Sequence, residues 1–409
     1  MRPLKICMVT TFYPPANFGG DGIFVYRLTN ALARYGHEVH VVHDVDAFHL
    51  LSNRPPQHNF PHPPNVVLHP LEYGKRGEID LLMVHQLGRP LLKHAALQEL
   101  LTGEQFDVIH FHNISLLGGP GILRYGDALK LCTLHECWFV CPMHVLWRFD
   151  REPCTRRTCL ACTLHGRRPP QLWRYTGQRD RDIAQVDAFI GPSHFVEEIY
   201  HRHGFPAPIH YLPYFFPDVE AEAHGETAQE TTPNDGRPYF IFVGRLEKIK
   251  GVQVLIEAFR HFQQADLLIA GAGAYEPELR AMAQGLPHVR FLGLLDHARL
   301  RALYRHAIAT LIPSLCYETF GWPTLESFAV STPVIVPDRG ALPEIVRSGG
   351  GLVYTNTVEL IEAMATLQRS PARRDTLGAD GYASYRTHYS EESHLAQYHR
   401  LLGELGGFN

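Results

Sequence analysis

The sequence predicts an α/β protein made of two tandem Rossmann-like, doubly wound domains that face a central cleft. At residues 5–42 a short apolar segment, a glycine-containing loop, an amphipathic stretch and a second apolar segment follow one another. The same order recurs at residues 239–273, after a polar segment that interrupts the pattern. This is the order of a strand–loop–helix–strand unit, from which parallel sheets are built. A chain of 409 residues is also too long for one ordinary core.

The first half of the chain contains the elements of one parallel sheet. Residues 5–9 (KICMV) form a strand, and a helix follows in which Phe24, Leu28 and Leu32 share one side. Gly36 ends this helix, where a glycine readily adopts left-handed backbone. Further strands are expected at residues 37–42, 107–111, 129–134 and 188–193. We therefore predict an N-terminal Rossmann-like domain at residues 1–213, with a cysteine- and arginine-rich insertion at 137–182.

The second half repeats the pattern after a break. Residues 214–237 are acidic, polar and proline-bearing without an apolar period, so they are expected to form a linker. A second Rossmann-like domain is predicted at 238–385, and a final helix at 386–409 is expected to pack back on the N-terminal domain. Its strands are expected at residues 239–243, 266–273, 291–293, 309–314 and 333–337, with a helix at 252–262.

The composition excludes several classes of protein. Hydrophobic residues make up 45% and charged residues 20%, as in a folded globular protein rather than a disordered one. The net charge of −4 gives no general attraction to nucleic acid. No apolar run approaches the roughly 18 residues that span a bilayer, and the N-terminus lacks the pattern of a signal peptide. We therefore expect a cytoplasmic protein.

The segment CYETFGWPTLES in the second half places two glutamates around a Gly-x-Pro sequence. Glu318 and Glu326 are eight positions apart, a rotation of about 80° on a continuous helix, so they would not share one face. Because residues 309–314 form a strand and proline suits the first position of a helix, we expect Glu318 in the loop and Glu326 in the first turn. Both would point into one crevice. An acid in a first turn also has a plainer explanation, since it complements the helix macrodipole.

The segment FVGRLEKIKG carries Arg245 and Lys250 just after the first strand of the same domain. Two such cations beside helix N-termini can hold a diphosphate. The alternative is two solvated surface cations, which is common for either residue alone.

These motifs together resemble one known family. FVGRLEKIKG, LLIAGAGAYEPELRAMA, VRFLGLLDHARLRALYRHA and the E-x7-E pair follow one another in order. The chain is similar in this to the retaining family-4 glycosyltransferases with the B-type, twin-Rossmann fold (GT-B). The likeness covers about residues 4–42 and 187–355, is thinner over 45–105 and is distinctive over 137–182.

The resemblance implies a site for a nucleoside-diphosphate sugar donor in the C-terminal domain. Arg245 and Lys250 would hold the diphosphate, Glu326 would accept hydrogen bonds from the ribose hydroxyls, and Glu318 would position the sugar. The other donor-site residues implied are Gly273 and Leu294, which line the nucleotide pocket, and Phe320 and Gly321, whose backbone amides help to place the sugar.

The resemblance also implies that the first domain, residues 1–213, binds the acceptor, and it implies roles for several residues there. Gly19 and Gly20 match the family's glycine-rich loop and are grouped with the donor-binding residues, although a turn alone would explain them. His135, in CTLHE, matches the family's histidine near the transferred sugar and is implied to be catalytic together with Glu318. The family commonly has Asp after this histidine, whereas this chain has Glu136.

The implied reaction transfers a sugar to a hydroxyl of a polysaccharide, glycolipid or natural product. No divalent metal is implied in catalysis, and the two D-x-D sequences, at 44–46 and 180–182, lie outside the donor motifs. The alternatives are a sugar-nucleotide epimerase or phosphorylase of the same fold, and a nucleotide-sugar-binding protein without catalysis.

Five of the eight cysteines lie between Cys137 and Cys162. Without a secretion signal, this clustering favours a metal site over disulfides. We predict a structural zinc site formed by Cys141, Cys154, Cys159 and Cys162. An iron–sulfur cluster and reduced, buried thiols are the alternatives.

Nine arginines lie between residues 148 and 181, near Trp147 and Trp173. A solvated face is the plain interpretation, and a surface for an anionic, lipid-linked acceptor at a membrane is the functional one. The amphipathic segment 89–101 either faces its own core or adds to such a surface. The predicted partners are therefore a nucleoside-diphosphate sugar, a sugar, lipid-linked or small-molecule acceptor and a peripheral membrane contact, with no nucleic acid.

Overall fold

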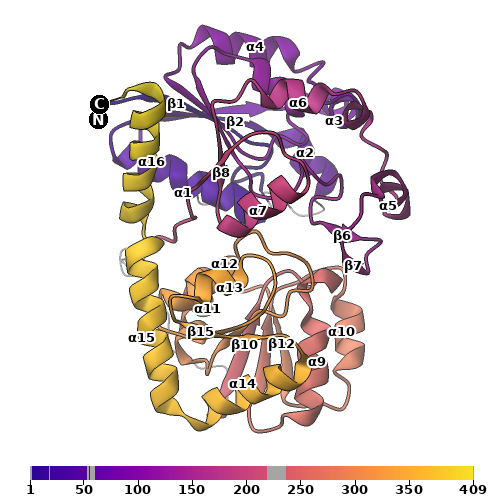
Figure 1. Ribbon diagram of the computed structural model, residues 1–409, viewed down its shortest axis with the longest axis vertical. Helices are drawn as coiled ribbons and strands as arrows, with labels where there is room; N and C mark the ends of the chain where they lie inside the picture. The colour runs from indigo at the N-terminus through magenta and orange to yellow at the C-terminus, as the bar shows by residue number, and fades with distance from the viewer. Residues whose placement is uncertain (1, 18, 53–54, 56–59, 219–235, 409) are drawn as a thin grey trace. The chain divides into compact units, whose positions relative to one another are not determined.

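The computed structural model describes residues 2–17, 19–52, 55, 60–218 and 236–408, and Figure 1 shows its helices and strands. The chain divides into two compact units. Unit 1 comprises Met1–Phe149, Cys154–Pro213 and Leu395–Asn409, and unit 2 comprises Asp150–Pro153 and Tyr214–His394.

Unit 1 is built on a seven-stranded parallel sheet with the order β3-β2-β1-β4-β5-β8-β9. The strand order turns back at β1 and β4, which is the switch point of a Rossmann-type sheet. The strands are β1 (Lys5–Val9), β2 (Glu38–Asp44), β3 (Val66–Leu71), β4 (Val108–Phe111), β5 (Leu129–Thr133), β8 (Ala188–Gly191) and β9 (Ile209–Tyr211).

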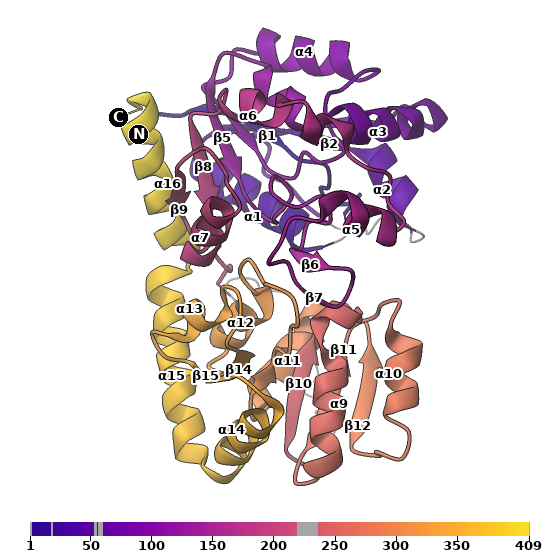
Figure 2. The same ribbon diagram turned by 45° about the vertical axis from the view of Figure 1, so that its right-hand side comes forward.

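Short helices surround this sheet (Figure 2). The α-helices are α1 (Gly20–Arg34), α2 (Val45–Leu51), α3 (Lys75–Leu87), α4 (His94–Gly103), α5 (Cys159–His165), α6 (Gln178–Ile183) and α7 (His194–Arg202). Two 3-10 helices, η1 (Pro120–Arg124) and η2 (Leu172–Tyr175), complete the list. The short strands β6 (Trp147–Arg148) and β7 (Glu152–Pro153) come between β5 and α5 in the chain, and β7 is assigned to unit 2.

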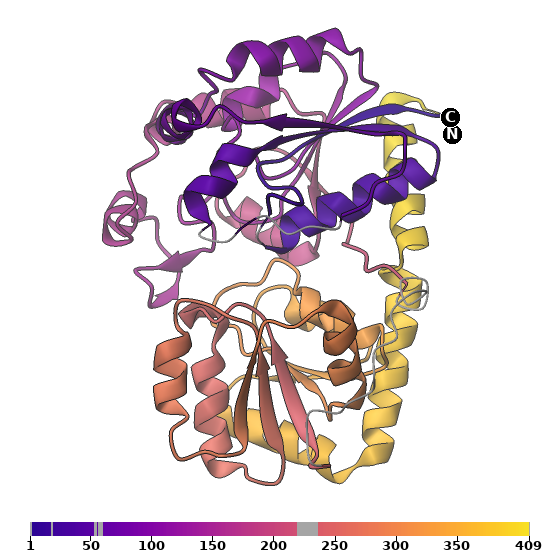
Figure 3. The ribbon, with the colours of Figure 1, turned by 180° about the vertical axis from the view of Figure 1, so that it is seen from behind.

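Unit 2 contains a six-stranded parallel sheet with the order β12-β11-β10-β13-β14-β15, seen from behind in Figure 3. By position in the chain this is the Rossmann order 3-2-1-4-5-6. The strands are β10 (Tyr239–Val243), β11 (Asp266–Ala270), β12 (Val289–Gly293), β13 (Thr310–Leu311), β14 (Val334–Pro337) and β15 (Gly351–Tyr354). The helices are η3 (Lys248–Lys250), α9 (Val252–His261), α10 (Glu276–Met282), α11 (His297–His306), α12 (Trp322–Phe328), α13 (Leu342–Val346), α14 (Thr357–Arg369) and α15 (Pro371–His388). The last helix, α16 (Glu391–Gly406), begins in unit 2, and its residues from Leu395 onward belong to unit 1.

Both faces of the unit 2 sheet are buried, as expected for a doubly wound parallel sheet. Alternate residues of a strand point to opposite faces. Phe240 and Phe242 of β10 pack into one apolar cluster, together with Phe259 of α9. Tyr239 and Ile241 of the same strand pack into a second cluster on the other face.

The end of the chain belongs to unit 1, because the last residues of α16 pack there (Figure 1). The hydroxyl of Tyr398 lies 3.1 Å from Nδ1 of His110, and Nε2 of His399 lies 3.0 Å from Nε2 of His37.

The predicted fold class, α/β with two Rossmann-like domains, is confirmed. One detail is wrong, because α12 begins at Trp322 and not at Pro323, which places Glu326 in the second turn. The helix dipole therefore does not explain this acid. The strands β3, β9 and β15 were not predicted, since they are short or carry no sustained apolar pattern. Residues 219–235 of the predicted linker lie outside the described residues.

No helix in the described ranges combines the length and the apolar character that crossing a membrane requires.

Candidate active site

Three of the predicted donor residues of unit 2 follow the strands β10 and β13, which are neighbours at the switch point of its sheet. Arg245 and Lys250 follow the carboxyl end of β10, and Glu318 follows that of β13. In open α/β sheets this edge is where ligands bind.

Lys250 and Glu318 form a partly buried ion pair. Their Nζ and Oε1 atoms lie 2.7 Å apart, and the side chains are 22% and 17% exposed. The hydroxyl of Ser314 donates a second hydrogen bond to the same carboxylate oxygen over 2.5 Å. The ion pair thus connects the segment after β10 with the segment after β13. Part of each side chain remains exposed to solvent.

Burial and charge act in opposite directions on this pair. Burial alone would raise the pKa of Glu318, but Lys250, the Ser314 hydroxyl and Arg245 together lower that pKa. Burial would lower the pKa of Lys250, but Glu318 raises it above its ordinary value. Both groups are therefore charged at neutral pH.

Arg245 lies at the exposed side of this pair. Its guanidinium is 59% exposed and donates to Glu247 over 2.8 Å. It is close enough to influence the pKa values of Lys250 and Glu318. The structure thus brings together three of the predicted donor-site side chains.

Two predicted glycines occupy places that no side chain can fill. A Cβ on Gly273 would lie 2.3 Å from the carbonyl oxygen of Leu246, which belongs to the loop that carries Arg245. Gly321 has a φ of 102°, and a Cβ there would lie 2.5 Å from Leu342. The tight packing of both loops therefore depends on glycine.

Glu326 has a partner that the sequence did not indicate. The hydroxyl of Tyr304, from α11, donates to Oε2 of Glu326 over 2.7 Å. Tyr304 is buried, and burial together with Glu326 raises the pKa of its hydroxyl well above the ordinary value. Tyr304 therefore stays neutral and orients the carboxylate. A tyrosine within an amphipathic helix gives no signal of such a role.

The other two predicted residues of this region, Leu294 and Phe320, lie in loops. Leu294 directly follows β12 and is exposed, whereas Phe320 is buried against Tyr214 with ring centroids 4.9 Å apart.

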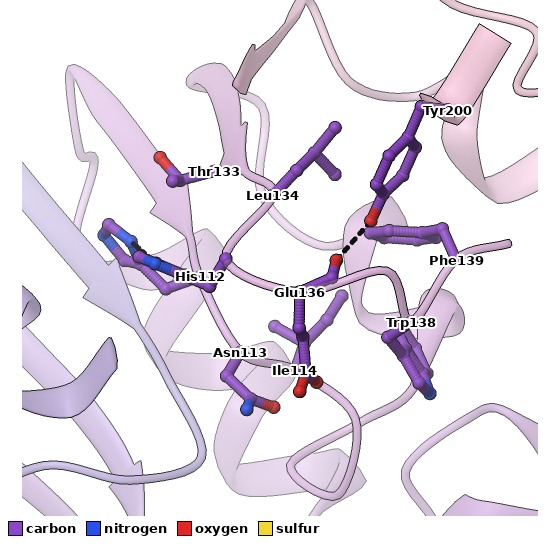
Figure 4. A pocket seen from close by; sticks show the side chains of 10 residues that line it. His112, Asn113, Ile114, Thr133, Leu134, Glu136, Trp138, Phe139 and Tyr200 are labelled. Atoms are coloured by element: carbon purple, nitrogen blue, oxygen red, sulfur yellow. Dashed lines mark hydrogen bonds between the residues drawn. The ribbon is translucent and has the colours of Figure 1, made fainter. Parts of the chain in front are cut away.

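In unit 1, His135 lines a pocket at the carboxyl ends of β4 and β5 (Figure 4). The lining residues include His112, Asn113, Glu136, Trp138 and Tyr200. Burial lowers the pKa of His135 to about 3, against the opposing effect of Glu136. His135 is therefore neutral in the folded protein.

Asp21 and Asn113, two polar residues that were not predicted, connect the glycine-rich loop with this pocket. Gly19 caps α1 and Gly20 begins it, and Asp21 in the first turn accepts from the amide of Asn113 over 2.9 Å. Asn113 itself lines the pocket. Burial and the charge of Glu136 raise the pKa of Asp21. The polar pair His112–Asn113, directly after an apolar strand, is the sequence signal that could have identified Asn113.

Glu136, which stands where the family commonly has Asp, contacts the cysteine-rich insertion. Its Oε1 lies 2.5 Å from Nδ1 of His144, and its backbone carbonyl accepts from the Tyr200 hydroxyl over 2.5 Å. Burial would raise the pKa of Glu136, but His144 lowers it.

The four cysteines of the predicted metal site line one pocket, next to Met143, Trp147 and Arg148. Cys159 and Cys162 come from α5, and Cys154 follows β7. All four are free thiols. Across the described residues, no three His, Cys, Asp or Glu side chains have the arrangement of a formed metal site.

Comparisons with known proteins identify the family to which the chain is similar. A model described as Glycosyltransferase Family 4 matches residues 18–216, and one described as Glycosyl transferases group 1 matches residues 225–384. A glycogen synthase of Mycobacterium tuberculosis is 27% identical over 405 residues, which cover 92% of this chain and 91% of that protein. A phosphatidyl-myo-inositol mannosyltransferase of Mycobacterium leprae is 36% identical over 155 residues, covering 36% of this chain and 41% of that protein.

Solved structures show the same fold. Sucrose-phosphate synthase from Thermosynechococcus elongatus is similar with a TM-score of 0.70 at 22% identity, covering 99% of this chain and all of that one. Anabaena HepE in complex with UDP and glucose is similar with a TM-score of 0.67 at 17% identity, covering 98% of this chain and 100% of that one. The two family matches, the relatives and the twin Rossmann-type sheets lead to one conclusion: this chain belongs to the family-4-like glycosyltransferases with the GT-B fold.

Proposed function

We propose that the protein is a retaining glycosyltransferase that moves a sugar from a nucleoside-diphosphate sugar to an acceptor hydroxyl. The observation that carries this proposal is the group of Arg245, Lys250 and Glu318 at the switch point of the unit 2 sheet. A pair of cations beside one ionised carboxylate suits a ligand that carries both a diphosphate and sugar hydroxyls.

The main catalytic task in this reaction is to stabilise negative charge. The bond from C1 of the sugar to the phosphate oxygen breaks, and charge develops on the departing diphosphate. Lys250 and Arg245 place fixed positive charge beside it, which lowers the barrier most where water is excluded. α12 has only seven residues, so we assign the stabilisation of this charge to the two side chains and not to the helix dipole.

The remaining steps assign the proton and the configuration. The acceptor oxygen forms its bond to C1 on the face from which the phosphate leaves, so the configuration is retained. The acceptor proton passes to the departing phosphate oxygen. Glu318, with the backbone at Phe320 and Gly321, holds the sugar, and Glu326, oriented by Tyr304, accepts from the ribose hydroxyls. Gly273 and Leu294 line the nucleotide pocket. These steps need no divalent metal.

In unit 1 we assign the acceptor side and the contact of His135 with the transferred sugar. Gly19 and Gly20 would let backbone approach the ligand at the start of α1. The relatives support a nucleotide-sugar donor, because HepE was solved with UDP and with UDP-glucose.

A binding screen tests this proposal. Nucleoside diphosphates and their sugar conjugates should raise the melting temperature, whereas the matching monophosphates should raise it much less. A ligand at a hundred times its dissociation constant adds about 2.7 kcal/mol to the free energy of unfolding. Differential scanning fluorimetry with UDP, GDP, ADP and TDP sugars, followed by assays of donor consumption, provides the measurement.

Two results would contradict the proposal. If no nucleoside diphosphate stabilises the protein at millimolar concentration, the donor site is wrong. If donors bind but are neither hydrolysed nor transferred, the protein is a binding protein without catalysis, and donor isomerisation would instead identify an epimerase.

We also propose that Cys141, Cys154, Cys159 and Cys162 bind one structural zinc ion. The four thiols line a single pocket, and zinc commonly takes four cysteine ligands in structural sites. The chain between Cys141 and Cys154 is irregular, with positive φ at the non-glycine residues His144, Leu146, Phe149 and Asp150. Such backbone is strained unless something else holds it. Binding would draw the four sulfurs closer than they lie here.

Metal analysis of untagged protein, produced in a reducing cytosol, is expected to give about one zinc per chain. Replacing Cys159 with serine should remove it, and replacing Cys316, a buried cysteine of unit 2, should not. A zinc content near zero in the unaltered protein would rule out the site. Iron together with visible absorption would instead identify an iron–sulfur cluster.

A peripheral membrane contact stays a prediction. Exposed apolar side chains occur on α2 (Leu50 and Leu51) and α3 (Ile79, Leu82 and Met83). They would suit a lipid-linked acceptor.

A further inference from the structure

The two cations that we assign to the diphosphate differ in how their acidic partners hold them. Lys250 and Glu318 are mostly buried, with side chains 22% and 17% exposed, and Ser314 donates a further hydrogen bond to the same carboxylate. Arg245 pairs instead with Glu247, and these two side chains are 59% and 35% exposed. The pair of Arg245 is thus the more accessible of the two.

The backbone after β10 brings Arg245 and Glu247 together. The amide of Glu247 donates to the carbonyl of Arg245 over 2.9 Å, so the chain turns at Leu246. Leu246 is fully buried, and its amide and carbonyl bond to Ala272 and Tyr275 over 3.0 and 2.9 Å. The turn is therefore anchored at its centre, while the charged side chains on both sides of it are accessible.

Arg245 and Glu247 have few other partners. Within the described part of the chain, the 2.8 Å contact with Glu247 is the only hydrogen bond or ion pair of the Arg245 side chain. The neighbouring cations have acids of their own, since Lys248 lies 3.4 Å from Asp150 and Lys250 pairs with the buried carboxylate described above. Glu247 is thus the acid that holds Arg245 in this structure.

A phosphate group can replace Glu247 on Arg245 at little cost. A guanidinium binds carboxylates and phosphates through the same N–H groups. An exposed ion pair is weak, because water screens both of its charges. We propose that Glu247 is a positioning residue that competes with the donor diphosphate for Arg245. It holds the guanidinium before the donor binds and takes it back as the nucleoside diphosphate leaves, which limits inhibition by this product. The inference rests on the proposed function.

Calorimetric titration of the full-length protein with UDP, GDP, ADP and TDP tests the inference without transfer. Glu247→Gln keeps the size of the side chain but removes its charge, so this variant should bind the recognised diphosphate about two- to fivefold more tightly. The matching monophosphate should gain less, because it carries less charge for Arg245 to bind. A substitution that merely damaged the loop would weaken binding instead.

Glu257→Gln is the matched control for this variant. Glu257 lies on α9 of the same unit and pairs with Arg260 over 3.1 Å at the surface. Its replacement changes the net charge of the protein equally but leaves the Arg245 contact in place. The affinity for the diphosphate should therefore change by less than about 1.5-fold.

Replacing Arg245 with glutamine separates two ways in which Glu247 could act. If Glu247 acts through Arg245, Glu247→Gln should raise the affinity less in the Arg245→Gln background than in the unaltered protein. Thermal shifts at millimolar diphosphate extend the measurement to this weaker background. An equal gain in both backgrounds would mean that Glu247 repels the phosphate directly, and the positioning role would be overturned.

Activity supplies a further readout. The donor KM and the inhibition constant of the nucleoside diphosphate should both fall about two- to fivefold in Glu247→Gln. We assign Glu247 no contact with the sugar or the acceptor, so kcat should not rise.

The results distinguish this inference from the function on which it rests. If the unaltered protein binds none of the four diphosphates, the proposed function fails, and the inference fails with it. If the protein binds one of them, but Glu247→Gln binds it no more tightly or Glu257→Gln shows the same gain, the inference alone is overturned.

Discussion

Replacing Lys250 with alanine is expected to lower the rate of sugar transfer by about 30- to 1000-fold, or about 2–4 kcal/mol of transition-state stabilisation. The substitution removes a positive charge from the place where we assign the departing diphosphate. It also leaves Glu318 without the ammonium that lies 2.7 Å away, and burial then raises the pKa of that carboxyl. The residual activity should therefore fall more steeply with decreasing pH than that of the unaltered enzyme.

Lys248 provides a matched control for this substitution. It lies in the same 3-10 helix two residues earlier, but its side chain is half exposed. Lys248→Ala should keep kcat/KM within about threefold, because solvent screens an exposed charge. Steady-state kinetics with the donor found by the binding screen would measure both variants. A Lys250→Ala enzyme within about twofold of the unaltered rate would show that the charge group is wrongly assigned.

Replacing Lys93 with methionine is expected to lower the free energy of unfolding by about 3–5 kcal/mol. Its ammonium is fully buried and lies 2.6 Å from Asp44 and 2.8 Å from Asp46. Both acids also bind backbone amides at helix starts. Asp44 caps α2, and Asp46, within α2, accepts from the amides of Tyr73 and Gly74, which precede α3. Without Lys93, the two buried carboxylates have no cation to balance their negative charges.

The effect of this change should depend on pH. Burial raises the pKa of Asp44 to about 6, although Lys93 opposes the shift. A carboxyl whose pKa is higher in the folded protein binds more protons when folded, so its contribution to stability grows as pH falls from about 6 to about 4. Removing Lys93 raises this pKa further, so the variant should recover part of its stability at about pH 5 relative to about pH 7.5.

Urea denaturation followed by tryptophan fluorescence would measure this effect, since three of the four tryptophans lie in unit 1. Lys75→Met, at the exposed start of α3, is the control and should change the free energy of unfolding by less than about 0.5 kcal/mol. A loss of less than about 1 kcal/mol in Lys93→Met would mean that the ion group contributes little to the stability of unit 1.

Much of the fold could be predicted from the sequence because parallel strands leave strong local patterns. Apolar runs such as residues 239–243, followed by glycine-containing loops, identify the strands and their carboxyl ends. Strands such as β9, with three residues, are fixed by pairing with a neighbour and leave no pattern of their own. The buried ion group of Lys93, Asp44 and Asp46 could not be predicted either, because it joins residues that are distant in the sequence. From the sequence, the D-x-D segment at 44–46 was interpreted as incidental.

The site could be predicted in part. Lys250 and Glu318 were recognisable because each follows a strand and stands in a motif. Their direct contact, and the support from Ser314, depend on the pairing of β10 with β13, which spacing alone does not give. The contacts of His112 with His135, of Asn113 with Asp21 and of Tyr304 with Glu326 could not be predicted, because each joins distant parts of the chain.

The return of the C-terminus to unit 1 has a consequence for the order in which the protein is made. Tyr398 touches His110 inside a sheet whose strands all precede residue 214, while the whole of unit 2 is encoded in between. During synthesis unit 1 therefore cannot complete its packing until residues 395–406 have left the ribosome, after the segments of unit 2 have been made.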